Sequence, residues 1–156
     1  MKNIIFKLLI FFIITSGSGY KVIKYSELAK LNINTIEATG DNEINFKIKR
    51  KLKTLSKAED ASPINIELTT TKSKFVKEKN SSNEVSKYQI DITVKLKVNS
   101  FKEKNVLNFT LKKTADFMVG IRQSKTREIE KRITNLLVDE LVEELIEKLN
   151  LDLNDI

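Results

Sequence analysis

The chain has 156 residues, which is enough for one domain of ordinary size and too few for two full hydrophobic cores. Hydrophobic residues make up 40% and charged residues 31%, a globular composition. The sequence has no Cys, which excludes disulfides, thiolate nucleophiles and Cys-ligated zinc, and no His, which removes the usual general base and the commonest metal ligand. The formal net charge of +7 indicates anionic partners only weakly.

Residues 1–18 have the order of a secretory signal peptide. Lys2 precedes an apolar run from Ile4 to Ile14 that Lys7 interrupts, and a string of small residues follows the run. This run is shorter than the roughly 20 residues that span a bilayer as a helix, so a buried core helix and an uncleaved interfacial anchor are the competing interpretations. We expect export, then a single domain over residues 19–150 and a frayed tail over residues 151–156.

The mature region begins with a short strand and an amphipathic helix. Apolar residues including Ile33 and Ile36 indicate a strand that is broken by a local irregularity and ends at Gly40. Asp41 is placed to act as the N-cap of the helix that follows. The apolar stripe of this helix consists of Ile44, Ile48, Leu52 and Leu55. A loop up to Pro63 ends it.

Three strands follow, and each alternates between apolar and polar residues. The alternation is short over residues 64–69 and unbroken over residues 87–98. In the third strand, over residues 107–119, Lys113 interrupts the apolar phase. The polar segment over residues 99–105 predicts that the last two strands form an antiparallel hairpin.

A long helix from about Ser124 to Leu149 completes the chain. Its apolar stripe consists of Ile129, Ile133, Leu136, Leu137, Leu141, Leu145 and Leu149. The order β-α-β-β-β-α predicts an α+β fold, a four-stranded mixed sheet covered on one face by two α-helices, with a right-handed crossover in the first strand-helix-strand unit. The expected core contains Tyr88, Ile90, Ile92, Val94, Leu96, Phe109, Leu111, Ile133, Leu141 and Leu145.

Two groups of cations are candidate sites for an anionic glycolipid. The first group leads out of the second strand into a hairpin with its tip at residues 80–83, and consists of Lys72, Lys74, Lys77 and Lys79. The alternative is a solvated loop whose lysines protect a sheet edge. The second group lies around the start of the last helix, where the helix dipole disfavours cations, and includes Arg122, Lys125 and Arg127. An anion-binding corner is one interpretation of it, and a genomic Lys/Arg bias is the other.

The polar face of the sheet is a candidate docking surface for another protein. Its outward cations include Lys95, Lys97 and Lys112. We expect no aromatic residue on this face for base stacking, which argues against nucleic acid as a partner. The carboxylates of the last helix, Asp139, Glu140, Glu143, Glu144 and Glu147, are interpreted as a solvated face, because a helical metal motif without His is not credible.

The segment Ser16–Val22, SGSGYKV, resembles the SGCGYKV-type start of the outer-membrane LPS-assembly lipoprotein LptE family. The order of the elements is similar to that family over nearly the whole mature chain. One position departs from the pattern, because Ser18 stands where the family carries its lipidated Cys. A serine hydroxyl cannot receive the thioether-linked diacylglycerol, so lipidation is excluded for the sequence as written.

The resemblance implies a non-enzymatic protein at the periplasmic side of the outer membrane. Such a protein is the partner of an LptD-type β-barrel, plugs the barrel lumen, and assists barrel assembly and delivery of lipopolysaccharide, which is a further candidate ligand. No cofactor is expected. The alternative is a stand-alone periplasmic carrier of an anionic lipid, which would need an internal apolar cavity. An enzyme that works with Asp, Glu and Lys alone has no positive support.

Overall fold

The computed structural model describes residues 32–56, 63–100 and 106–154. Its elements are β1 (Asn32–Gly40), α2 (Asn42–Leu55), β2 (Pro63–Lys79), β3 (Val85–Ser100), β4 (Val106–Met118) and α3 (Gln123–Asn154). The predicted signal peptide, the junction segment Ser16–Val22 and the turn at residues 101–105 lie outside the described residues. Among the described residues, no helix is both long enough and apolar enough to cross a membrane.

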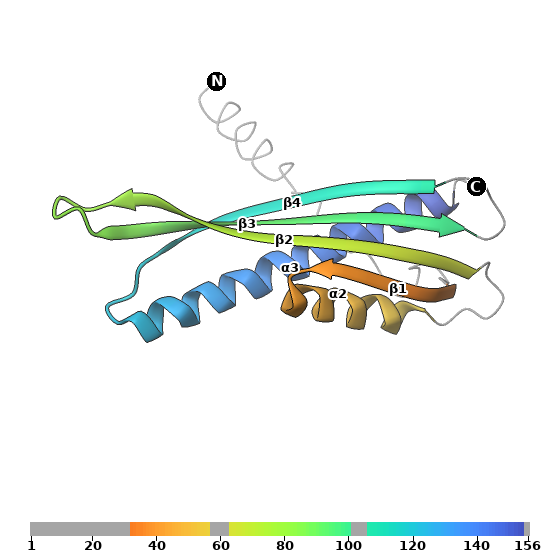
Figure 1. Ribbon diagram of the computed structural model, residues 1–156, viewed down its shortest axis with the longest axis horizontal. Coiled ribbons are helices and arrows are strands. Elements are labelled where there is room, and N and C mark those ends of the chain that lie inside the picture. Colours follow the sequence, from red (N-terminus) through yellow and green to blue (C-terminus); the bar gives the residue numbers. More distant parts are fainter. Residues whose placement is uncertain (1–31, 57–62, 101–105, 155–156) are drawn as a thin grey trace, which may run out of the picture.

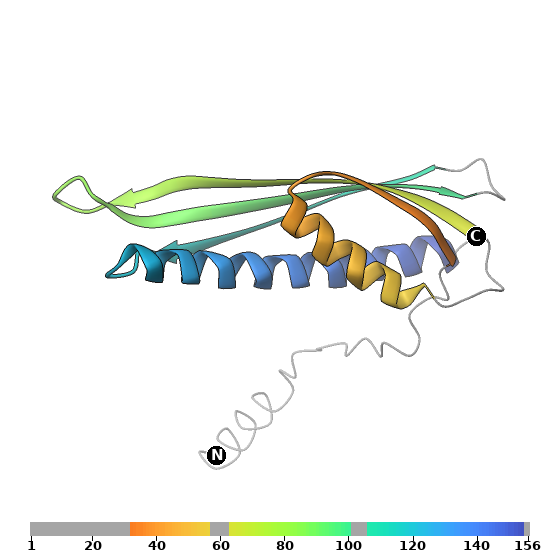
Figure 2. The same cartoon turned by 60° about the horizontal axis from the view of Figure 1, so that its bottom comes forward.

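The four strands form one mixed sheet in the order β1-β2-β3-β4 (Figure 1). β1 pairs with β2 in parallel, and the other two pairs are antiparallel. Both helices lie on the same side of the sheet and leave the other side uncovered (Figure 2). The predicted α+β fold is therefore confirmed. The register of β1 shifts between Ile33 and Thr35, which is the irregularity that the sequence predicts.

A tight connection turns the chain from β1 into α2. Gly40 adopts a φ of 98°, and a Cβ atom at this position would lie 1.8 Å from the carbonyl oxygen of Thr70. Asp41 is the N-cap, because its side chain accepts a 3.0 Å hydrogen bond from the backbone N–H of Ile44. The buried hydroxyl of Thr70 donates to the side-chain oxygen of buried Asn45 at 2.8 Å. This polar network fixes where α2 leaves the sheet.

The core lies between the sheet and the two helices as one cluster of buried apolar side chains. Most of the expected core is confirmed as buried: Ile90, Ile92, Val94, Leu96, Leu111, Leu141 and Leu145. Tyr88, Phe109 and Ile133 are only partly buried and pack against the margin of the cluster. Leu136 was expected on the apolar stripe of the last helix, but 53% of it is exposed because the buried stripe passes through Leu137 instead.

Two elements are longer than the sequence predicts. β2 continues to Lys79, so the lysine-rich segment is strand rather than loop, because it pairs with the regular strand β3 as far as Val85. α3 continues to Asn154, so it includes residues 151–154, which the sequence analysis assigned to the C-terminal tail. Leu149, fully buried near the C-terminal end of α3, anchors this end of the helix to the core.

Candidate docking surface

The uncovered side of the sheet presents polar side chains from all four strands, and we call it the outer face. These side chains alternate with the buried residues along each strand, so the register places them opposite the helices. The outer face includes Glu37, Thr39, Glu67, Thr69, Asp91, Thr93, Lys95, Lys97, Thr110, Lys112 and Thr114. It is therefore rich in hydroxyl groups and carries both signs of charge.

The three lysines predicted for docking all lie on the outer face, and two of them are paired there. Lys97 contacts Glu67 at 2.8 Å, and Lys112 contacts Asp91 at 2.6 Å. The hydrogen bond from Lys97 lowers the pKa of Glu67, and the one from Lys112 lowers the pKa of Asp91. Lys95 makes no ion pair with the described residues. The outer face thus balances most of its charge internally.

Hydroxyl groups connect neighbouring strands across the outer face. The hydroxyls of Thr39 and Thr69 lie 3.1 Å apart, and Thr114 donates to Asp91 at 3.1 Å. One expectation for this face is wrong, because Phe75 lies on it, opposite Gln89, and is about half exposed. The extension of β2 carries this aromatic residue onto the face.

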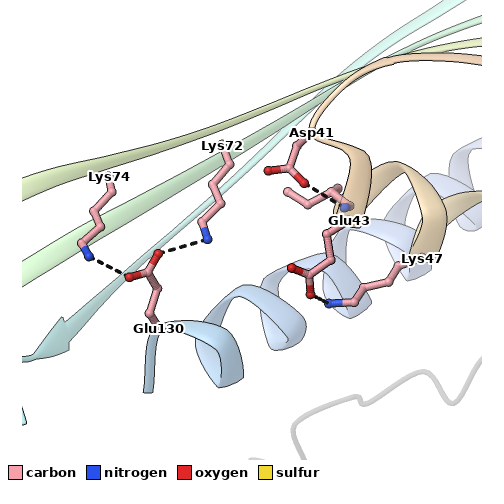
Figure 3. A network of polar contacts seen from close by, with 7 residues as sticks. Asp41, Glu43, Lys47, Lys72, Lys74 and Glu130 are labelled. Atoms are coloured by element: carbon pink, nitrogen blue, oxygen red, sulfur yellow. Dashed lines mark hydrogen bonds and ion pairs between the residues drawn. The ribbon is translucent and has the colours of Figure 1, made fainter. Parts of the chain in front are cut away.

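The first candidate glycolipid group does not form one site. Lys72 and Lys74 point towards the helices, where both contact Glu130 of α3, at 3.1 and 2.7 Å (Figure 3). The ammonium group of Lys74 also lies 4.3 Å from the ring centroid of Tyr88. Burial raises the pKa of Glu130, but the hydrogen bonds from Lys74 and Lys72 outweigh it, so the pKa is lowered. These two lysines therefore stabilise the contact between β2 and α3.

The other two lysines of this group point elsewhere. Lys77 contacts Asp116 across the sheet at 2.6 Å, and Lys79 donates to Asn83 at 3.1 Å near the hairpin tip. Asn83 has a φ of 63°, and the backbone of this turn is closed by the side chain of Asn80. Of the four lysines, only Lys79 is without a carboxylate partner among the described residues.

The second candidate group lies where β4 connects to α3, at the same end of the molecule as the β2–β3 hairpin (Figures 1 and 2). Lys125 contacts Glu128 at 2.8 Å in the first turns of the helix. Arg122 and Arg127 are exposed and make no ion pair with the described residues. These two guanidinium groups are therefore available to an external anion.

The helix carboxylates are mostly structural or solvated. Asp139 contacts Lys51 at 3.1 Å, and Glu144 contacts Lys113 at 2.9 Å. The hydrogen bond to Glu144 raises the pKa of Lys113. Lys113 occupies an inward position of β4 where the alternation predicts an apolar residue. This position was the sequence signal for an inward contact with a carboxylate, and the sequence analysis did not infer that contact. No group of three or more candidate metal-ligating side chains occurs in the described ranges.

A hollow of about 180 Å³ lies between the two helices rather than in the core. It is lined by Lys47, Arg50, Lys51, Asn135, Val138, Asp139 and Val142. Lys47 bridges the helices by contacting Glu43 at 2.7 Å and by donating to Asn135. Five of these seven lining residues are charged or polar, which does not suit an acyl chain.

No protein-family model matches the chain, and no curated protein matches its sequence. Solved structures with the same fold include rare lipoprotein B from Shewanella oneidensis, with a TM-score of 0.57 and 15% identity over 78% of this chain and 99% of that chain. An uncharacterized lipoprotein B from Nitrosomonas europaea gives 0.57 and 13% identity, covering 79% of this chain and 86% of its own. A putative lipoprotein from Caulobacter crescentus gives 0.57 and 11%, covering 83% and 95%. The chain therefore has the fold of these bacterial lipoproteins.

Proposed function

We propose that the protein is a non-enzymatic partner of an LptD-type outer-membrane β-barrel, which it plugs and whose assembly it assists from the periplasmic side. The observation that carries the proposal is the outer face, a whole side of a four-stranded sheet that neither described helix covers and that is polar throughout most of its extent. The fold shared with three lipoproteins supports it. The resemblance of Ser16–Val22 to the start of the LptE family is our ground for naming the barrel as the proposed partner.

The chemistry of the outer face matches that of a barrel lumen. The interior of a large transmembrane barrel is polar and hydrated, because lipid-facing and lumen-facing residues alternate along each strand. A plug surface in such a lumen must form hydrogen bonds without carrying a large unbalanced charge. Threonine hydroxyls and the paired side chains of Lys97 and Lys112 meet both requirements.

The interior of the domain favours a plug over a lipid carrier. The buried apolar side chains of the sheet and both helices form one continuous cluster. A carrier would need an apolar cavity at that place, whereas the hollow of about 180 Å³ is between the helices and lined by Lys47, Lys51 and Asp139 among others. One continuous apolar cluster beneath an extended polar surface, as the described residues form, is the arrangement that a plug requires.

Delivery of lipopolysaccharide is part of the proposal, but fewer cations than the sequence predicts are free to contact it. Lys72 and Lys74 already neutralise Glu130, so they are poor candidates for binding lipid A phosphates. Arg122, Arg127 and Lys79 have no carboxylate partner among the described residues and are better placed for this role.

The test is co-purification with the barrel. We expect the triple variant Lys95→Glu, Lys97→Glu and Lys112→Glu to lose an LptD-type barrel from detergent-solubilised outer membranes, because it makes the outer face strongly acidic. The matched control carries the same change in net charge on the helices: Lys49→Glu, Lys53→Glu and Lys148→Glu. Exposed pairs are each worth about 0 to 1 kcal/mol, so both variants should stay folded by circular dichroism. Wild-type recovery of the barrel by the sheet variant would contradict the proposal.

A further inference from the structure

A short apolar segment is exposed where β4 connects to α3. Met118 is 57% exposed, Val119 is more than one-third exposed, and Ile121 is fully exposed. Sequence reasoning placed Val119 on the apolar phase of the last strand, but the core ends at Phe117. We call residues 118–121 the apolar tip.

More apolar surface lies at the same end of the molecule. Phe75 and Val76, near the end of β2, are each about half exposed. β2 leads into the hairpin that projects beside the start of α3, and both views show these segments at one end (Figures 1 and 2). Of the nine large apolar residues exposed in the described ranges, five are in these two segments. Such clustering, unlike single exposed residues, marks an interaction site.

The apolar tip is held in place by hydrogen bonds. The N–H of Val119 donates to the carbonyl of Ser86 at 3.0 Å, and the N–H of Gly120 donates to the hydroxyl of Thr126 at 3.0 Å. A Cβ atom on Gly120 would lie 2.8 Å from the Cβ atom of Lys125, so the turn packs tightly against α3. The exposure of Ile121 is therefore a property of the fold.

The charges around the apolar tip identify the surface that it fits. Arg122 and Arg127 flank the tip without ion pairs to the described residues, while Lys125 shares its charge with Glu128. Exposed apolar side chains beside unpaired cations match the boundary between anionic headgroups and acyl chains.

We propose that this end of the protein docks on the surface of an anionic phospholipid bilayer. Ile121 and Met118 enter the boundary between headgroups and acyl chains, and the guanidinium groups of Arg122 and Arg127 contact lipid phosphates. This inference does not depend on the β-barrel partner, because the proposed ligand is a phospholipid bilayer and its test contains no barrel protein.

The sequence contains no Trp, so the fluorescence of a single introduced Trp reports the surroundings of that one position. This holds even if the apolar N-terminal segment of the full chain also binds the vesicle. The probe variant is Ile121→Trp, and the matched control is Leu151→Trp, which is exposed near the other end of α3. We expect vesicles of phosphatidylcholine with phosphatidylglycerol to shift the emission of Trp at position 121 to the blue. Brominated lipids should quench this emission and leave that of the control unchanged.

The charge requirement is tested in the same probe variant. Each cation near an anionic membrane strengthens binding about fivefold, so Arg122→Gln with Arg127→Gln should weaken binding roughly 25-fold. The control pair Lys53→Gln with Lys148→Gln removes the same charge elsewhere and should change binding less than threefold. Added salt should weaken binding of the probe variant more than that of the double-Arg variant.

Three results would overturn the proposal. The first is an unshifted emission at position 121, which would leave the apolar tip for a protein partner. The second is equal quenching at positions 121 and 151, which would show that the rest of the chain brings the protein to the vesicle. The third is a blue shift of the Trp emission at position 121 that is equally large with pure phosphatidylcholine vesicles or with inorganic phosphate alone. This result would show that the ligand is not an anionic bilayer.

Discussion

Replacing Glu130 with Gln tests whether the lysines of β2 stabilise the fold or serve an external anion. The carboxylate accepts hydrogen bonds from Lys72 and Lys74 at 3.1 and 2.7 Å, and its side chain is only 21% exposed (Figure 3). Hydrogen bonds to charged groups contribute about 1.5 to 3 kcal/mol each when they are buried. Both lysines are partly hydrated, Gln can keep one neutral hydrogen bond, and Lys74 keeps its contact with the ring of Tyr88. We therefore expect Glu130→Gln to lower the free energy of unfolding by about 1 to 2 kcal/mol.

This contribution should depend on pH in a defined direction. The pKa of Glu130 is lower in the folded protein than its ordinary value of 4.5, which we take for the unfolded chain. A depressed carboxyl pKa contributes stability that is fully present above the unfolded value and is lost as the pH falls through the folded value. The wild type and Glu130→Gln should therefore differ in stability at pH 7, and the difference should shrink as the pH falls below 4.5 and through the lowered pKa of the folded state.

Urea unfolding followed by circular dichroism measures the difference in the free energy of unfolding at pH 7 and at acidic pH. The matched control is Glu128→Gln, two residues before Glu130 in α3. The carboxylate of Glu128 contacts Lys125, and its side chain is 68% exposed. We expect the control to cost less than about 0.5 kcal/mol. Equal costs for the two variants, or a Glu130→Gln cost that does not decrease as the pH falls below 4.5, would refute the assignment of Glu130 as a partly buried bridge between β2 and α3.

Three further predictions concern the fold. Gly40→Ala should lower the free energy of unfolding by about 3 kcal/mol or more, since it adds backbone strain and a clash with Thr70, and a thermal shift of only a degree or two would contradict this. Thr134→Val should raise it by about 1 kcal/mol, because the buried hydroxyl has no partner within the described structure, and a loss in urea unfolding would count against that geometry. Leu141→Ala should cost about 2 to 5 kcal/mol by calorimetry, and a near-zero cost would mean that the apolar stripe of α3 faces water.

The fold could be predicted from the sequence wherever apolar residues recur with one clear spacing, either every second residue or every three to four residues. The alternation in β3 placed Ile90, Ile92 and Val94 in the core without ambiguity, since a strand that slips by one residue exposes its whole apolar set. The stripe of α2 and the N-cap at Asp41 were similarly unambiguous. The distribution of burial along α3 was less clear, because Leu136 and Leu137 both fit a broad stripe and only packing decided between them.

The candidate sites could be predicted less well, because they depend on contacts between distant segments. Four lysines in eight residues suggest one basic site, but the alternation of a strand sends Lys72 and Lys74 to one side and Lys77 to the other. Their acidic partners lie about 40 to 60 residues away in the chain, where no local pattern identifies them. The apolar tip was missed because the expected strand ran one residue beyond its true end.

Photo-crosslinking in living cells tests the central claim, that the outer face docks on an outer-membrane β-barrel. Benzoylphenylalanine in place of Thr93 lies near the middle of the outer face, and the same residue in place of Leu136 is exposed on the helical side. The account predicts that Thr93→benzoylphenylalanine yields a crosslink to an LptD-type barrel protein, and that Leu136→benzoylphenylalanine yields a much weaker one. A barrel crosslink from position 136 without one from position 93 would place the docking surface on the helices and contradict the account.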